Sequence, residues 1–165
     1  MAIPEQIDAD GLSDYLDIMT KAIFQAGLSW SIVESKWPAF RECFAGFDPD
    51  VVSQFSAKDL ERLMKDERIL RSKKKIDATI ANAKTLIQLE KEYGGFRNYL
   101  HKQGDYDELS KDMRKRFKFL GELSVYYFLF RIKEPVPPFE KWVATIPGDH
   151  PRMREMVELA RNKKK

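Results

Sequence analysis

The sequence predicts an all-α fold, and three observations support that prediction. Apolar residues recur at three- and four-residue spacing, which is typical of helices with one buried face. No segment alternates convincingly between apolar and polar residues, as a half-buried strand would. Serine, aspartate, glycine and proline fall where helices are expected to begin and end. Because 165 residues is the size of one ordinary domain, we expect a single domain over residues 1–165.

The first two helices are predicted from an apolar stripe and a glycine. The stripe begins at Leu12, and Gly27 ends the first helix because glycine adopts the left-handed conformation of a final turn. Ser29 or Ser31 can cap the second helix. Pro38 is expected to break or restart that helix, since proline lacks a backbone N–H. The residues expected to face inward there are Ile32, Val33, Trp37 and Phe40.

Three cap motifs predict the helices in the middle of the chain. Aspartate followed by proline begins a short helix over residues 48–55. Ser56 with Asp59 resembles a capping box for a second short helix. Ser72 is a plausible cap for a long helix, which the glycine pair at 94–95 ends.

The C-terminal part contains a helix-hairpin-helix pattern. Residues 96–100 suggest one or two further turns, and residues 103–106 are predicted to form an exposed loop. The tight link Phe117–Gly121 separates two helical segments, and prolines at 135, 137 and 138 end the second. Helices are expected over residues 109–116, 122–132, 139–144 and from Pro151 to about residue 162.

Composition is that of a globular protein, with 43% hydrophobic and 33% charged residues. No apolar run approaches the length needed to span a membrane, and residues 1–10 do not resemble a secretion signal, so we expect a cytoplasmic protein. The net charge of +3 does not by itself indicate nucleic acid as a partner. Basic residues nevertheless cluster at 71–75, 114–118 and 161–165. The single cysteine, Cys43, is expected to be a buried, inert thiol.

Three segments in matching order carry a resemblance to a known family. They are Gln25-Ala26-Gly27-Leu28-Ser29-Trp30, Arg71–Ile76 running into Ala81–Lys84, and Phe117–Gly121. Over roughly residues 12–135 they resemble the DNA-3-methyladenine glycosylase I family. The resemblance implies a helix-hairpin-helix glycosylase fold, with two helical lobes around a cleft. It also implies a base excision repair enzyme, expected to be a monomer, that acts on double-stranded DNA with alkylated bases and needs no cofactor.

The base-binding residues implied by the resemblance lie around Trp30. A base inside a duplex must be everted before its glycosidic bond can be attacked, and a flat ring such as Trp30 can stack on it. Gln25 can hydrogen-bond the base edge, and Tyr15 can fill part of the pocket. Members of the family carry a base-holding glutamate where this chain has Ala22. Packing of Trp30 within the core is the alternative.

The DNA-binding residues are expected at the hairpin and at the start of the long helix. Backbone N–H groups of a tight turn that leads into a helix bind a phosphate, and Lys118 and Gly121 lie in that turn. The lysines at 73, 74 and 75 (Lys73, Lys74 and Lys75), with Arg114 and Arg116, would extend a basic face. Such contacts position a duplex without reading its sequence.

Catalytic and metal-binding residues are harder to assign. Glu140 lies about twenty residues after the hairpin glycine, where many helix-hairpin-helix glycosylases carry a catalytic aspartate, but a solvated glutamate at a helix start is the alternative. The family commonly holds a zinc ion near its termini. Here Cys43, His101 and His150 lie elsewhere and lack the spacing of a zinc site, so no metal is expected.

The function expected from these residues is hydrolysis of the N-glycosidic bond of an alkylated purine, with 3-methyladenine as the first candidate. Because Ala22 replaces the glutamate, a non-catalytic DNA-binding protein of the same fold, or a glycosylase with altered base preference, is the alternative. An all-helical scaffold without a nucleic-acid role is a third class, consistent with the modest net charge.

Overall fold

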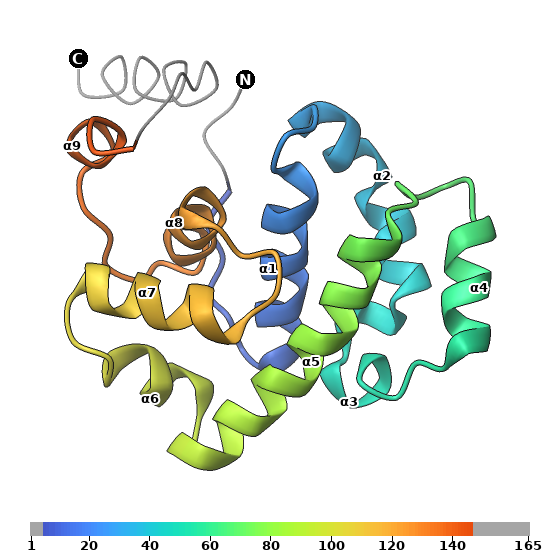
Figure 1. Cartoon of the computed structure of the whole chain (residues 1–165), viewed down its shortest axis with the longest axis horizontal. Helices are drawn as coiled ribbons and strands as arrows, with labels where there is room; N and C mark the ends of the chain where they lie inside the picture. Colours follow the sequence, from blue (N-terminus) through green and yellow to red (C-terminus); the bar gives the residue numbers. More distant parts are fainter. Residues whose placement is uncertain (1–4, 147–165) are drawn as a thin grey trace.

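A computed structural model describes residues 5–146, and all regular structure within that range is helical (Figure 1). The predicted all-α fold is therefore confirmed, and no described helix is long and apolar enough to cross a membrane. The elements are α1 (Leu12–Gln25), α2 (Trp30–Cys43), a 3-10 turn η1 (Ala45–Phe47), α3 (Pro49–Val52), α4 (Ala57–Lys65), α5 (Lys73–Tyr93), α6 (Phe96–His101), α7 (Tyr106–Arg116), α8 (Glu122–Arg131) and α9 (Phe139–Val143).

Helix α1 lies at the centre of the fold. It packs against α8 on one side and against α5 and α2 on the other (Figure 1). Leu16, Met19 and Ile23 form its fully buried stripe, with spacings of three and four residues. Burial of each such side chain stabilises the fold by about 1.5–3 kcal/mol. The main core continues from α1 to Ile132, just beyond α8, so α1 holds α8 and α5 in fixed relative positions.

Three of the predicted side-chain caps are present in the structure, whereas the prediction for α2 was wrong, because its N-cap residue Ser29 makes no side-chain capping hydrogen bond. The Asp48 side chain accepts a hydrogen bond from the backbone N–H of Asp50 at the start of α3, although α3 ends at Val52 rather than at residue 55. Ser56 and Asp59 form the reciprocal capping box of α4. Ser72 caps α5 by accepting from the N–H of Lys75. Each of these caps contributes about 1 kcal/mol and fixes where its helix begins.

Pro38 does not break α2, so that prediction was wrong. The helix is continuous because Trp37, on one side of the proline, stacks on Phe40 at 4.8 Å and on Phe47 at 5.3 Å between ring centroids. Burial of these rings offsets the cost of an internal proline, which is about 3 kcal/mol. Ile32 was also predicted wrongly: it is 49% exposed, because the buried stripe of α2 runs through Val33, Trp37 and Phe40.

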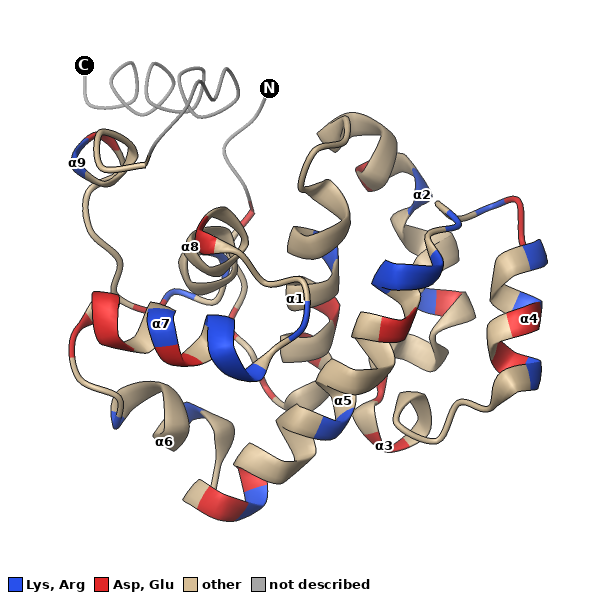
Figure 2. Ribbon diagram, in the orientation of Figure 1, with Lys and Arg blue, Asp and Glu red and all other residues tan. Residues whose placement is uncertain are grey.

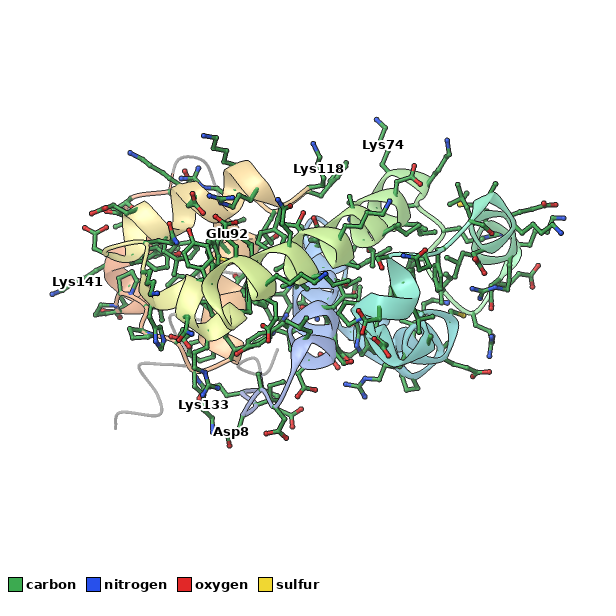
Figure 3. The ribbon with its side chains drawn as sticks, turned by 90° about the horizontal axis from the view of Figure 1, so that it is seen from below. Asp8, Lys74, Glu92, Lys118, Lys133 and Lys141 are labelled. Carbon is green, nitrogen blue, oxygen red and sulfur yellow. The ribbon has the colours of Figure 1, made fainter. Side chains whose placement is uncertain are left out.

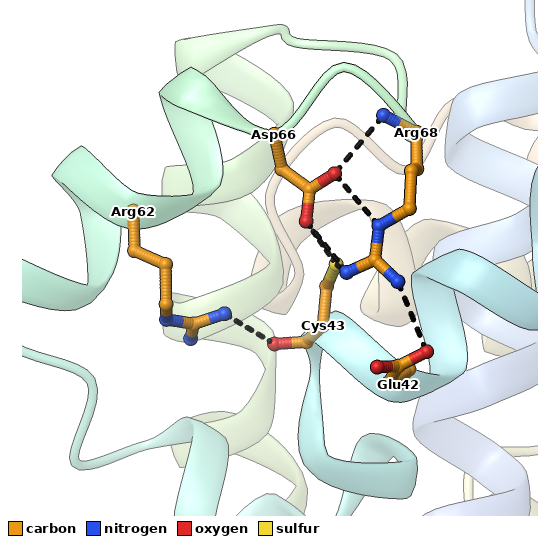
Figure 4. Close-up of polar contacts among 5 residues, drawn as sticks. All are labelled: Glu42, Cys43, Arg62, Asp66 and Arg68. Atoms are coloured by element: carbon orange, nitrogen blue, oxygen red, sulfur yellow. Dashed lines mark hydrogen bonds and ion pairs between the residues drawn. The ribbon is translucent and has the colours of Figure 1, made fainter.

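Cys43 belongs to a network of hydrogen bonds and ion pairs at the end of α2 (Figure 4). Its thiol donates a hydrogen bond to Asp66 at 3.1 Å, and Arg68 binds both Asp66 and Glu42. Arg62 donates to the backbone carbonyl of Cys43. Burial, with Asp66 adding to it, raises the pKa of the Cys43 thiol to about 11. The thiol therefore stays protonated at neutral pH, as expected for an inert structural cysteine.

The predicted helix-hairpin-helix is present as α7, Phe117–Gly121 and α8. Helix α7 begins at Tyr106, earlier than the sequence predicts, because the Asp105 side chain caps it by accepting from the N–H of Glu108. The short helix expected after the prolines is α9. The helix predicted from Pro151, and His150, lie outside the described residues.

Candidate functional site

Trp30 is the first residue of α2, directly after a turn in which Gly27 has a φ of +76°. Its side chain is half-buried. The indole contacts Tyr127 of α8 edge to face, with ring centroids 4.9 Å apart. It borders an aromatic cluster from α8 and α9 that comprises Tyr126, Tyr127, Phe139 and Trp142. Trp30 is thus held at the margin of packed rings and not sealed among them.

Arg131 is the last residue of α8, and its buried guanidinium lies over the ring of Trp30. The guanidinium carbon lies 5.2 Å from the centroid of the Trp30 ring. Nη2 of Arg131 donates a hydrogen bond to the side-chain oxygen of Gln25, while Nη1 has no hydrogen-bond partner within residues 5–146. Arg131 is only 3% exposed, and desolvation lowers its pKa to about 10, so it remains charged at neutral pH.

Gln25, Trp30 and Arg131 together form what we call the polar cluster. The structure brings Gln25 and Trp30 together as the sequence predicts, since both contact the same guanidinium. Arg131 was not predicted. A signal was present in the sequence: a lone arginine interrupts the otherwise apolar run from Val125 to Ile132. Buried charges without an ionic partner are rare because their desolvation is costly.

Ala22 lies one turn before Gln25 on the same helix and is 2% exposed. The resemblance implies a carboxylate at this position, and alanine supplies none. No described acidic side chain forms an ion pair with Arg131; Glu34 is paired with Lys21, and Asp17 with Arg41. The charged group beside Trp30 is therefore positive where the resemblance implies a negative one.

Tyr15 is not part of the polar cluster. It lies in the main core, where its ring packs edge-on against Phe96 at 4.8 Å and near Phe128 at 6.4 Å. Tyr15 precedes Gln25 by ten residues, which is about 15 Å along α1, and the two lie at opposite ends of the helix. The structure thus places Tyr15 in the core and not beside Trp30, contrary to the expectation that it fills the pocket.

Glu140 lies in the first turn of the short helix α9 and is exposed. Its neighbour Phe139 packs on Tyr126 and Tyr127, and Tyr127 in turn contacts Trp30. The carboxylate is thereby carried by an element that borders the same aromatic cluster as Trp30.

The hairpin is fixed to α5 by one buried side chain, Asn82. Its Oδ1 accepts from the backbone N–H of Lys118 at 2.7 Å, and its Nδ2 donates to the Lys118 carbonyl at 3.1 Å. Phe117 and Leu120 anchor the hairpin in the core, whereas the side chain of Lys118 is exposed. Sequence reasoning did not find Asn82, because its partner is 36 residues away.

Gly121 is the N-cap residue of α8, which has no side-chain cap. Its φ of −90° is accessible to any residue, and a Cβ placed there would meet no atom within 4 Å. Neither the backbone conformation nor internal packing requires glycine. The space beside the first N–H groups of α8 is thus open to a group that approaches from outside, such as a phosphate.

Lysines of α5 form a basic end beside the hairpin (Figure 2). Lys73 and Lys74 are exposed in the first turn of α5, which contains no acidic residue. The N-terminal end of a helix already carries a partial positive charge from the helix dipole, so lysines there are unfavourable. A bound anion would therefore stabilise the start of α5. Lys74 and Lys118 project to the same side of the molecule, and Lys133 projects to the opposite side (Figure 3).

Lys75 has a different environment from its two neighbours. Its amine donates to the carbonyl of Ala26 at 3.3 Å and lies 5.6 Å from the ring centroid of Phe24. Partial burial lowers its pKa. Lys75 therefore ties α5 to the turn that precedes Trp30.

The two arginines near the hairpin also form ion pairs within the protein. Arg114 pairs with Glu122 at 3.1 Å, and Arg116 pairs with Asp112 at 2.7 Å.

Cys43 and His101 lie apart, and no group of three or more metal-ligating side chains occurs within the described part of the chain. His101 is exposed and pairs with Glu134.

Comparison with known proteins identifies relatives of this chain. The family model for methyladenine glycosylase matches residues 10–107. DNA-3-methyladenine glycosylase 1 of Escherichia coli (strain K12) is 34% identical over 126 residues, which cover 64% of this chain and 67% of that protein. DNA-3-methyladenine glycosylase of Haemophilus influenzae is 32% identical over 126 residues, with 64% and 68% covered.

Solved structures give the same result. The structure of 3-methyladenine DNA glycosylase I from Staphylococcus aureus, described for its recognition of 3-methyladenine, matches with a TM-score of 0.69 at 28% identity. The match covers 78% of this chain and 79% of that one. On the family match, the sequence identity and the shared fold, this chain belongs to the methyladenine glycosylase family.

Proposed function

We propose that this protein is a DNA glycosylase that everts an alkylated purine from duplex DNA and hydrolyses its N-glycosidic bond. Family membership and the names of the relatives support the reaction, and 3-methyladenine is the lesion that those names point to. The observation that carries the proposal is the placement of two features on one helix. Gly121 and the open helix start lie at one end of α8, and Arg131, which contacts Trp30, ends it.

This arrangement fits base eversion geometrically. Helix α8 has 10 residues, so its two ends are about 15 Å apart. A phosphate bound at Gly121 would hold the DNA backbone, while Trp30 at the other end would stack on the everted base. Because α8 packs on α1 and hairpin residue Lys118 is bonded to Asn82, the separation between the two contacts is fixed before DNA binds.

The chemistry requires little acid-base assistance when the base is already cationic. Water adds to C1′ of the deoxyribose, the bond from C1′ to the base nitrogen breaks, and the base leaves with the bonding electrons as a neutral molecule. The water loses a proton to solvent or to a carboxylate, for which Glu140 is the candidate. Binding and desolvation of the everted nucleotide supply the remaining stabilisation of the transition state.

Contacts to the DNA backbone are assigned to Lys73, Lys74, Lys118 and the N–H groups after Gly121. These groups read no base edge, so they would bind any duplex. Lys75 contributes to the positive potential of this end, while its amine holds the carbonyl of Ala26.

Release of bases from damaged DNA tests this function directly. Duplex DNA treated with a methylating agent is incubated with the full chain, and released bases and abasic sites are both quantified. We expect release of a methylated purine with an equal number of abasic sites. Lys133→Ala, which alters a lysine on the opposite side of the molecule, serves as the control and should release bases as the unchanged protein does. DNA binding without any base release would contradict the proposal.

A further inference from the structure

Phe119, in the hairpin turn, is the most exposed large hydrophobic side chain among residues 5–146, at 53%. It belongs to neither of the two hydrophobic clusters in that range. A phenyl ring in contact with water gains little of the stabilisation that burial gives. Single exposed apolar residues are nevertheless common on protein surfaces, so the exposure of Phe119 needs a second observation before it indicates a partner.

The backbone conformation of Phe119 is that second observation. Its φ is +57°, in the left-handed region that bulky residues rarely adopt. Phe47 has nearly the same φ, +58°, but its ring is fully buried and stacks on Trp37 and Phe44. Packing therefore offsets the strain at Phe47, whereas Phe119 has no comparable packing within the described part of the chain. Glycine or asparagine would adopt this conformation more readily.

The rest of the turn holds Phe119 in this conformation from both sides. The backbone of Lys118 is bonded to Asn82, and Leu120 is anchored in the core. The ring of Phe119 is thus presented to solvent on a fixed backbone, so little conformational freedom is lost when it binds a partner. Strain that the surrounding structure maintains is typical of ligand-binding positions.

We propose that Phe119 is a DNA-positioning residue, whose ring packs against a deoxyribose of the strand that the hairpin holds. The inference rests on the proposed function, which assigns phosphates to Lys118 and to the N–H groups after Gly121. Phe119 lies between these two contacts in the chain. A deoxyribose joins successive phosphates of a strand, and its C–H groups are the apolar surface that DNA offers beside them. Lys118 and the positive end of the α8 dipole attract the phosphates, and the ring adds an apolar contact to the sugar.

This contact positions the duplex and does not recognise the damaged base. A ring on a sugar meets no base edge, so it strengthens the binding of damaged and undamaged duplexes equally. Helix α8 connects the turn to Arg131, which contacts Trp30. A sugar fixed against Phe119 therefore sets where the everted nucleotide meets Trp30.

Duplex binding by two variants of Phe119 tests the proposal. Dissociation constants of the full chain for an undamaged duplex are measured by fluorescence anisotropy at several salt concentrations. We expect Phe119→Asn to raise Kd by about 3- to 10-fold, because about half of the burial value of one phenylalanine side chain is lost. The slope of log K against log salt should stay the same, since no charge is removed. Phe119→Leu keeps an apolar side chain and should recover most of the affinity.

Thermal unfolding separates this role from a structural one. Asparagine adopts a positive φ more readily than phenylalanine, so the Tm of Phe119→Asn should equal or exceed that of the unchanged protein. Val51→Ala is the matched control, because it shortens another exposed apolar side chain, on α3, and it should leave Kd unchanged. For Phe119→Asn, an unchanged Kd, a changed salt slope or a lower Tm would overturn the proposal.

A fluorescent base in the duplex identifies what the ring touches. 2-Aminopurine becomes brighter when its neighbours unstack, as they would if Phe119 entered between two bases. At saturating protein we expect equal brightness with the unchanged protein and with Phe119→Asn. A brighter signal with the unchanged protein would place the ring between bases and overturn the contact with deoxyribose.

Base release from methylated duplex DNA distinguishes failure of this inference from failure of the proposed function. Release by the unchanged protein, together with an unchanged Kd for Phe119→Asn, would refute the role of Phe119 and support the glycosylase. No release, together with weaker binding by Phe119→Asn at an unchanged salt slope, would refute the glycosylase and leave Phe119 as a DNA contact.

Discussion

Asn82→Ala is the substitution that tests how the hairpin is positioned. The Asn82 amide exchanges two hydrogen bonds with the backbone of Lys118, at 2.7 and 3.1 Å, and is 1% exposed. Each neutral hydrogen bond contributes about 1 kcal/mol net, so loss of both is expected to cost about 2 kcal/mol. For a chain of this size that corresponds to a fall in Tm of about 4–8 °C.

The same substitution should weaken DNA binding beyond its effect on folding. Without Asn82 the Lys118 backbone is no longer held against α5, so the phosphate-binding turn loses its fixed geometry. We expect a clear rise in Kd for undamaged duplex DNA, measured by fluorescence anisotropy at a temperature where the variant is fully folded. Gln88→Ala is the matched control, because it removes an exposed amide from the same helix.

Two results would refute this reasoning. An unchanged Tm would mean that the two hydrogen bonds are replaced at no cost, and the hairpin would not depend on α5. A lower Tm with unchanged DNA affinity would mean that the geometry of the hairpin does not matter for binding, and the phosphate contact would have to be sought elsewhere.

Three further predictions follow from particular groups. Gly121→Ala should change unfolding free energy by less than about 1 kcal/mol, because a Cβ there meets no protein atom, yet weaken duplex binding in anisotropy titrations by crowding the phosphate; unchanged affinity would argue against that contact. The affinity of the protein for duplex DNA falls as salt rises, and Lys118→Ala should make the slope of log K against log salt shallower by about 1, whereas Lys133→Ala should leave that slope unchanged. A slope for Lys118→Ala equal to that of the unchanged protein would remove Lys118 from the interface. Cys43 is buried and its raised pKa keeps the thiol protonated, so it should react with iodoacetamide at pH 8 only after the protein unfolds, as followed by mass spectrometry. Rapid labelling of the native protein would contradict the burial of this thiol.

Local rules in the sequence predicted most of the helices. The caps at Asp48, Ser56 and Ser72 and the stop at Gly94 involve residues within a few positions of each other, and all are present. Pro38 was predicted wrongly because the aromatic packing that keeps α2 continuous is tertiary, and no local rule describes it.

The candidate site was predicted less completely, because part of it depends on tertiary contacts that local sequence rules do not describe. Trp30 and Gln25 come from one contiguous motif, and the structure brings them together. Arg131 contacts Gln25 from 106 residues away, and Asn82 contacts Lys118 from 36 residues away, so neither role follows from local spacing. Tyr15 shares a helix with Gln25, but its distance along that helix places it in the core.

The most direct test of the central claim, that Trp30 stacks on an everted purine, is a paired measurement on Trp30→Ala with methylated duplex DNA. Single-turnover rates of base release and Kd for undamaged duplex are determined for the variant, for Trp30→Phe and for the unchanged protein. Base–aromatic stacking is worth about 1–3 kcal/mol. We expect Trp30→Ala to slow release by about 5- to 150-fold with Kd nearly unchanged, and Trp30→Phe to recover most of the rate. Release at the full rate by Trp30→Ala, or an equal loss of rate and DNA affinity, would contradict the account.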